Sequence, residues 1–160
     1  MTMLAYHLVW TTYGTWLPGD RRGWIKKNTL GVQQPDPERE RQARERMAEP
    51  QIALSGQQRA LVEQTIRDHC SIRGWVLHAV NVRSNHVHVV VSADRVADEV
   101  MNQLKAWCSR KLSDAAGLKT SVAKRAGRRR WFTEGGDKEM IEDEEYLVNA
   151  IHYVLEGQGK

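Results

Sequence analysis

Residues 75–92 read WVLHAVNVRSNHVHVVVS, and the predicted fold is built around them. It contains two valine-rich runs, residues 75–82 and 85–92, and β-branched residues of this kind favour strands. Only Arg83 and Ser84 separate the two runs, which is the pattern of antiparallel strands joined by a tight turn. The stretch therefore predicts a β-hairpin in the middle of the chain.

The second strand of this hairpin has two different faces. Side chains alternate across a strand, so Val87, Val89 and Val91 share one face. His86 and His88 share the other face. The valines predict the face toward a core, and the imidazoles therefore point away from it. Two adjacent histidines are a suitable platform for a divalent metal ion, and a polar surface without ligands is the alternative interpretation.

A helix precedes the hairpin. Residues 56–72 carry apolar side chains at helical spacing. Ser55 and Gln58 have the spacing of a capping box at its start, and Gly74 is placed to end it.

A second helix follows the hairpin, with Asp94 as its cap and Gly117 at its end. Its apolar stripe consists of Ala97, Val100, Met101, Leu104, Cys108 and Leu112. Strands are predicted at residues 6–12 and 131–133, and a last helix at residues 143–156.

This order of elements predicts the α+β class, with a ferredoxin-like βαββαβ antiparallel sheet, helices on one face and an added C-terminal helix. The other face of the sheet is expected to stay open, and such folds place RNA, DNA or an active site there. Residues 1–160 are interpreted as one domain. Residues 14–50 form a long basic and charged insertion, in which residues 38–47 predict a solvated helix or a linker.

Composition excludes several classes of protein. The net charge of +4 and the pI of about 9.2 favour an anionic partner. No apolar run approaches the about 20 residues that span a membrane, and the N-terminus lacks the features of a signal peptide. We therefore expect a cytoplasmic protein with no membrane partner. Cys70 and Cys108 lie in helix-like apolar patterns, which predicts buried thiols rather than a disulfide or a zinc site.

Basic residues are concentrated in two segments. The first loop carries Arg21, Arg22, Lys26 and Lys27. The segment before the predicted last strand carries Lys119, Lys124, Arg125, Arg128, Arg129 and Arg130 and no acidic residue. Such clusters bind nucleic-acid phosphates, and Trp24 or Trp131 could stack on unpaired bases. A solubilising surface is the alternative for both clusters, and a place in the core is the alternative for Trp131.

The last helix presents a tyrosine away from its apolar stripe. The stripe consists of Leu147, Val148, Ile151, Val154 and Leu155. Tyr153 points to the opposite side, together with Tyr146 and Asn149. An anchored helix with an outward tyrosine suits a nucleophile. The alternative, which is the better interpretation of Tyr146, is that these rings cover a neighbouring loop or helix.

Four segments together carry a resemblance to a known family: NHVHVVV, YHLVWTTYGTW, RRRWFTEGGDKEMIEDEEYL and AIHYVLEGQ. With them the chain resembles the single-tyrosine transposases of the HUH superfamily, and most closely the REP-associated tyrosine transposases and short transposase-like proteins of bacterial chromosomes. The resemblance implies a metal-dependent transposase that cleaves and transfers single-stranded DNA, with hairpin DNA as the expected substrate. Relatives include dimers and monomers, so a homodimer is one of the two expected states.

The resemblance also implies roles for individual residues. His86 and His88 match the ligands of a Mg²⁺ or Mn²⁺ ion, and Tyr153 matches a nucleophile that forms a 5′-phosphotyrosine intermediate. The family usually places Asn or Gln about one helical turn after the tyrosine, where this chain has Gly157. Gln158 is the preferred third ligand, with Glu156 as the alternative.

Two other functions compete with this one. The first is a catalytically inactive ferredoxin-like module that binds DNA or RNA, and the departure at Gly157 is its main support. The second, weaker one is a metal-dependent hydrolase that uses water as the nucleophile at His86 and His88.

Overall fold

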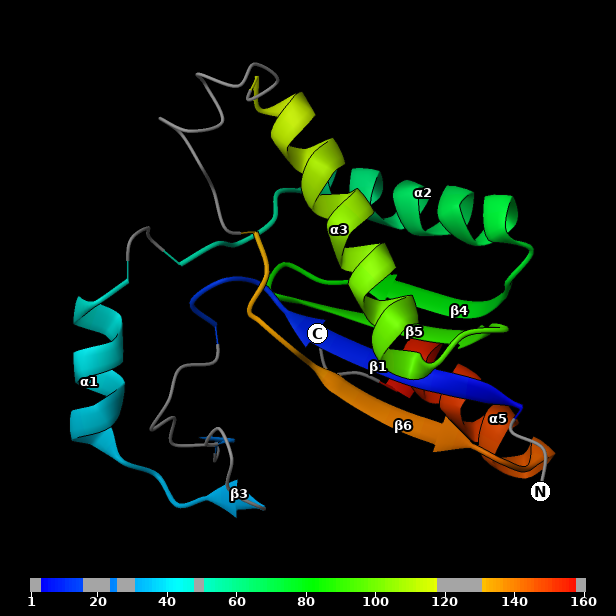
Figure 1. The fold of residues 1–160 in the computed structure, drawn as a ribbon, viewed down its shortest axis with the longest axis horizontal. Coiled ribbons are helices and arrows are strands. Elements are labelled where there is room, and N and C mark those ends of the chain that lie inside the picture. The colour runs from blue at the N-terminus through cyan, green and yellow to red at the C-terminus, as the bar shows by residue number, and fades with distance from the viewer. Residues whose placement is uncertain (1–3, 16–23, 26–30, 48–50, 118–130, 158–160) are drawn as a thin grey trace.

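The computed structural model describes residues 4–15, 24–25, 31–47, 51–117 and 131–157. Its main sheet is antiparallel and has the strand order β4-β5-β1-β6 (Figure 1). The strands are β1 (Ala5–Thr11), β4 (Val76–Val82), β5 (His86–Ser92) and β6 (Asp137–Ile141). With α2 (Gly56–Arg73) between β1 and β4, and α3 (Ala97–Ala115) between β5 and β6, the ferredoxin-like order is confirmed.

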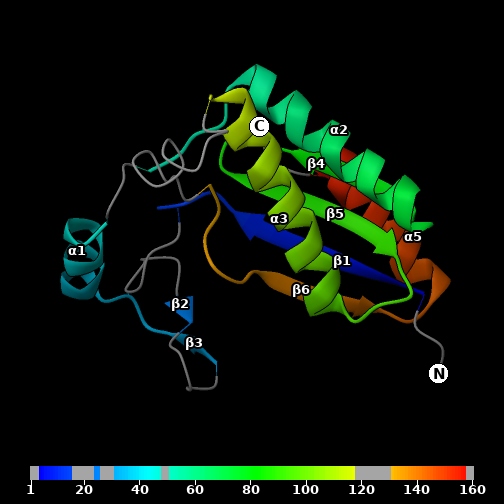
Figure 2. The ribbon, with the colours of Figure 1, turned by 45° about the horizontal axis from the view of Figure 1, so that its top comes forward.

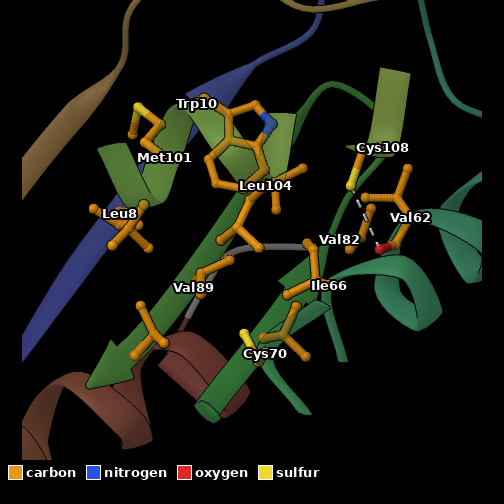
Figure 3. Close-up of a cluster of buried hydrophobic side chains, with 14 of the residues drawn as sticks. Leu8, Trp10, Val62, Ile66, Cys70, Val82, Val89, Met101, Leu104 and Cys108 are labelled. Carbon is orange, nitrogen blue, oxygen red and sulfur yellow. Dashed lines mark hydrogen bonds between the residues drawn. The ribbon is translucent and has the colours of Figure 1, made fainter. Parts of the chain in front are cut away.

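Helices α2 and α3 cover one face of the sheet, which we call the core face (Figure 2). Alternate side chains of the two central strands are completely or almost completely buried there: Leu8, Trp10, Val87, Val89 and Val91. They pack with the predicted apolar stripe of α3 (Figure 3). Cys70 and Cys108 are buried free thiols in this core, as predicted, and burial raises their pKa values to about 11 and about 12.

The two long helices begin differently. The capping box of α2 is confirmed, because the Gln58 amide donates to Ser55 Oγ at 3.1 Å and the Ser55 amide donates to Gln58 Oε1 at 2.9 Å. Gly74 ends α2 with a φ of 73°. The expected cap of α3 is wrong: its N-cap is Val96, without a side-chain hydrogen bond. Asp94 instead accepts a hydrogen bond from the Trp75 indole at 2.9 Å.

The fourth strand lies later in the chain than expected. Around residues 131–133 the structure has only an isolated bridge between Phe132 and Thr12, and β6 pairs with β1 instead. The Trp131 ring is buried in the core, where Nε1 donates to Ser113 Oγ at 2.9 Å. Gly136 then passes so close to β1 that a Cβ would lie 2.7 Å from the Val9 carbonyl oxygen. The regular strand β6 begins directly after this glycine, at Asp137.

The opposite face of the sheet is not open, which corrects the expectation. Helix α5 (Glu144–His152) and the short π-helix η1 (Tyr153–Gly157) lie against it, and we call it the α5 face (Figures 1 and 2). A second apolar cluster joins the sheet to the helices: Ala5, Ala79, Val90, Ile141, Ala150 and Val154. Leu147 and Ile151 pack at its edge.

The predicted stripe of the last helix is therefore partly wrong. Val148 and Leu155 are 63% and 54% exposed, because the helix turns residues 147, 150, 151 and 154 toward the sheet. Residues spaced three and four positions apart lie on the same face of a helix.

The insertion contains short elements of its own. Strands β2 (Trp24–Ile25) and β3 (Val32–Gln33) pair with each other, which the sequence did not predict, and α1 (Pro37–Glu45) has no buried residue. Helix α1 is thus the solvated helix expected there. Within the described part of the chain, no helix is both long and apolar enough to cross a membrane.

Candidate active site

Three histidines meet on the α5 face. His86 and His88 project from β5 as predicted, with 5.0 Å between their ring centroids. Strand β1 runs antiparallel beside β5, with Val9 opposite His88 and His7 opposite Val90. The His7 ring consequently lies beside His88, at a centroid distance of 5.4 Å.

Hydrogen bonds orient two of these rings. His86 Nδ1 lies 2.7 Å from Asn85 Oδ1, which can only accept, so Nδ1 carries the proton and the lone pair of the neutral ring is at Nε2. His88 Nδ1 lies 3.1 Å from His7 Nε2. Metal-binding histidines are usually held in this manner, with the second ring nitrogen engaged by a neighbouring group.

His88 is held in its neutral form. It is only 7% exposed, and its pKa falls to about 4, first through burial and then through the nearby His86, His7 and Arg83. Burial also lowers the pKa of His7, against the opposing effect of the Glu139 and Asp137 carboxylates on β6. A neutral imidazole is the form that can donate a lone pair to a cation.

Tyr153 stands beside these histidines. Its ring centroid lies 5.8 Å from that of His88 and 6.1 Å from that of His7, and the residue is 47% exposed. The tyrosine is the first residue of η1, where the helix widens from α to π geometry. Single π turns of this kind are frequent at functional sites.

Both ends of the tyrosine helix are fixed. Asp143 caps α5 by accepting from the Tyr146 amide at 2.7 Å. At the other end, Asn81 Nδ2 on β4 donates to the Val154 carbonyl oxygen at 2.8 Å. This bond to the residue next to Tyr153 ties the position of the phenol to the sheet.

The second tyrosine of the helix is engaged elsewhere. The Tyr146 hydroxyl donates to the Glu139 carboxylate on β6, which raises the pKa of the phenol. The Tyr146 hydroxyl therefore contacts a neighbouring strand, whereas the alternative interpretation named a loop or a helix.

The histidine pair can supply two ligands of a metal site. Among the residues with described positions, no group of three or more His, Cys, Asp or Glu is arranged to hold a metal ion. Glu156 is turned toward its own helix, with Oε2 at 3.1 Å from His152 Nδ1. Gln158 lies outside the described residues. The imidazole nitrogens of His86 and His88 suit Mn²⁺, and Mg²⁺ would draw its further ligands from oxygen atoms.

The predicted DNA-binding residues cannot be placed. Arg21, Arg22, Lys26, Lys27, Arg128, Arg129 and Arg130 all lie outside the described residues. Trp131 is 3% exposed in the core, which excludes its ring as a stacking surface in this structure.

Sequence reasoning missed three members of the site: His7, Asn81 and Glu139. His7 stands in the quoted segment YHLVWTTYGTW, and its position two residues before Val9 gives it the same face of β1. This alternation of side chains in β1 could be predicted from the sequence. The register that places His7 beside His88 could not, because the two residues are 81 positions apart in the chain.

Comparison with known proteins places this chain in a family. Residues 48–135, more than half of the chain, match the family described as Transposase IS200 like. The chain belongs to the IS200-like transposase family. The matched part of this IS200-like protein contains His86 and His88 and ends before Tyr153. None of the curated proteins matches it.

Two solved structures share the fold of this family member. One is a REP-associated tyrosine transposase bound to a REP hairpin, with a TM-score of 0.53 and 11% identity over 96% of this chain. The present chain covers 66% of that protein, slightly less than two thirds of its length. The other is a candidate transposase from Deinococcus radiodurans R1, with a TM-score of 0.51, 19% identity, and coverage of 99% of this chain and 92% of that one.

Proposed function

We propose that this protein cleaves and rejoins single-stranded DNA through a covalent bond to Tyr153. The observation that carries the proposal is the placement of the Tyr153 ring 5.8 Å from that of His88, which is itself paired with His86. A half-exposed phenol beside two imidazoles combines a nucleophile with donors for a cation.

The histidines would hold the cation against the DNA. In this proposal the ring nitrogens of His86 and His88 bind Mg²⁺ or Mn²⁺. When bound, such an ion polarises a phosphate and neutralises the charge that develops during phosphoryl transfer. Burial of His88 keeps its ring unprotonated at neutral pH and available as a ligand.

Gln158 remains the proposed third ligand. The contact of Glu156 with His152 leaves the alternative less well supported.

The reaction conserves the energy of the DNA backbone. The phenolic oxygen attacks phosphorus, a bond to that oxygen forms, and the bond to the 3′ oxygen breaks. The phenol loses a proton and the departing 3′ oxygen takes one up, which leaves a 5′-phosphotyrosine and a free 3′-hydroxyl. A 3′-hydroxyl can attack this phosphotyrosine in the reverse direction, so strands can be rejoined without a nucleotide cofactor.

The proposed substrate is single-stranded DNA that contains a hairpin. The REP-associated tyrosine transposase with the same fold is bound to a REP hairpin. The present chain carries basic segments that are expected to bind phosphates. Arg21, Arg22, Lys26 and Lys27 would contact DNA from the insertion, and Arg128, Arg129 and Arg130 from the segment before Trp131.

The experiment incubates the purified protein with Mn²⁺ and a hairpin oligonucleotide labelled at its 3′ end, because the fragment bound to the tyrosine keeps that end, and separates the products under denaturing conditions. Wild type should give a labelled protein–DNA adduct. Tyr153→Phe should give none, and Tyr146→Phe, the matched change one heptad earlier, should retain it. An adduct that persists in Tyr153→Phe contradicts the proposal. DNA binding without any adduct would favour the inactive binding module, and cleavage without an adduct would favour the hydrolase.

A further inference from the structure

His7 has no role in the proposed reaction, yet it is packed into the site. It lies on β1, the strand between β5 and β6. Its Nε2 is 3.1 Å from His88 Nδ1, and its ring also contacts Tyr153. The ring therefore links a proposed metal ligand to the proposed nucleophile.

A single proton determines what His88 can do. Two neutral imidazoles joined through Nε2 of one and Nδ1 of the other share one N–H between them. If His88 donates from Nδ1, its lone pair is at Nε2. If His7 donates from Nε2, the proton of His88 is at Nε2, and that nitrogen cannot bind a cation.

The contact of the neighbouring His86 is an example of the first arrangement. His86, on the same face of β5, carries its proton at Nδ1 because Asn85 Oδ1 accepts from it, and has its lone pair at Nε2. For His88 to have its proton at Nδ1 and its lone pair at Nε2 in the same way, His7 must act as the acceptor. Among the contacts described, His7 is the partner of His88 Nδ1.

We propose that His7 is a positioning residue that accepts the Nδ1 proton of His88 and so fixes the His88 tautomer whose Nε2 binds the metal ion. This inference rests on the proposed function for its purpose, although the tautomer itself can be measured without metal or DNA. Neighbours that orient a metal-binding histidine in this way typically contribute about 10–100-fold in metal affinity.

The first test is the tautomer of His88 in the metal-free protein, read from the couplings between ring nitrogens and carbon-bound protons in ¹⁵N-histidine NMR spectra. Wild type should show the proton at Nδ1. His7→Leu, which has no acceptor, should give a mixture of tautomers. His7→Gln offers a side-chain oxygen in place of the ring nitrogen and should restore the Nδ1 form. A proton at Nε2 in wild type would overturn the inference.

The second test is the affinity for Mn²⁺, measured by calorimetry without DNA. His7→Leu should bind about 10–100-fold more weakly than wild type, and His7→Gln should recover most of the loss. The matched control is His78→Leu on β4, since His78 is also partly buried and hydrogen-bonded, to Ser92 Oγ at 2.8 Å. It should not change the affinity.

The outcomes separate this inference from the proposed function. Equal Mn²⁺ affinities of wild type and His7→Leu would overturn the role of His7 and leave the adduct assay unaffected. A wild-type protein that binds no Mn²⁺ would contradict the proposed metal site, while the NMR spectra would still decide the tautomer. If His7→Leu fails to fold, the wild-type tautomer and the His7→Gln variant decide the question.

Discussion

The core face and the α5 face of the sheet are built from alternate residues of the same strands, and they differ in what they bury. On the core face, Leu8 and Val89 pack among apolar side chains of α2 and α3. On the α5 face, the neighbouring residues His7 and His88 form a polar group beside Tyr153. Each central strand contributes alternate residues to both faces. The packed core face therefore also holds the neighbouring site residues on the α5 face in position. Stability and chemistry should therefore respond to different substitutions.

The largest effect should come from the core face. Leu8→Ala should lower the free energy of unfolding by about 2–5 kcal/mol, because Leu8 is completely buried and its removal leaves a cavity. His7→Ala, one residue away, should cost about 1 kcal/mol, the typical value of one hydrogen bond. Urea unfolding curves measure both. Equal losses would show that the two faces are not energetically distinct.

The next effect concerns metal binding on the α5 face. His88→Ala should weaken Mn²⁺ binding by more than about 100-fold, since it removes a ligand rather than a neighbour of one. The matched control is His69→Ala on α2, because His69 is as buried as His88 and hydrogen-bonded to Gln103 at 2.8 Å, but lies in the layer of helices. Calorimetry should detect no loss for His69→Ala. A similar loss in both variants would mean that the fold, and not the site, was damaged.

A smaller effect should appear in the pH dependence of the free energy of unfolding, and it should arise from a lysine on α3. Lys105 Nζ on α3 donates to the Thr133 and Gly135 carbonyl oxygens, both at 2.7 Å, and burial lowers the pKa of this amine from 10.5 to about 8. The unfolded chain therefore holds this proton more tightly than the native state. The free energy of unfolding should therefore rise between about pH 8 and 10.5. Below pH 8 the amine is charged in both states, so the cost of burying its charge is complete and constant.

Lys105→Met supplies the comparison for this prediction. The rise attributed to Lys105 should amount to roughly 2 kcal/mol, allowing for the part of the amine that water reaches. It should be missing from the unfolding curves of Lys105→Met, in which other groups still titrate. Parallel pH curves for the two proteins would exclude a depressed pKa at this amine.

The smallest effect should distinguish a change at the tyrosine helix from a change at the metal ligands. Asn81→Ala removes the hydrogen bond to the Val154 carbonyl oxygen, and one such bond contributes about 1 kcal/mol. Amides of η1 should exchange faster with solvent and the adduct should form more slowly, with the Mn²⁺ affinity unchanged. Unchanged exchange at η1 would show that the sheet does not hold the helix through Asn81.

Much of the core face could be predicted from the sequence. The two-residue spacing of Val87, Val89 and Val91 indicates one face of a strand, and Gly74 marks the end of a clear helical pattern, so local periodicity was sufficient. The edge strand β6 was missed because its residues, DKEMI, are mostly charged and exposed. Its strand conformation comes from pairing with β1 and not from its own pattern.

The α5 face was harder to predict for a physical reason. The alternation in β5 indicated where His86 and His88 point, and the helical spacing indicated that Tyr153 leaves the apolar stripe. The expectation of an open face failed because α5 buries Ala150, and η1 buries Val154, in a cluster with small residues of the sheet, Ala5 and Ala79. Such docking depends on shape across distant segments, as does the meeting of His7 with His88.

The role of Tyr153 is tested most directly by identifying the residue that carries DNA in the covalent adduct. The adduct formed with Mn²⁺ and a hairpin oligonucleotide is digested with protease and nuclease, and the modified peptide is sequenced by mass spectrometry. We expect a nucleotide phosphate on Tyr153. A modification on Tyr146, whose hydroxyl is bound to Glu139, or on any other residue would contradict it.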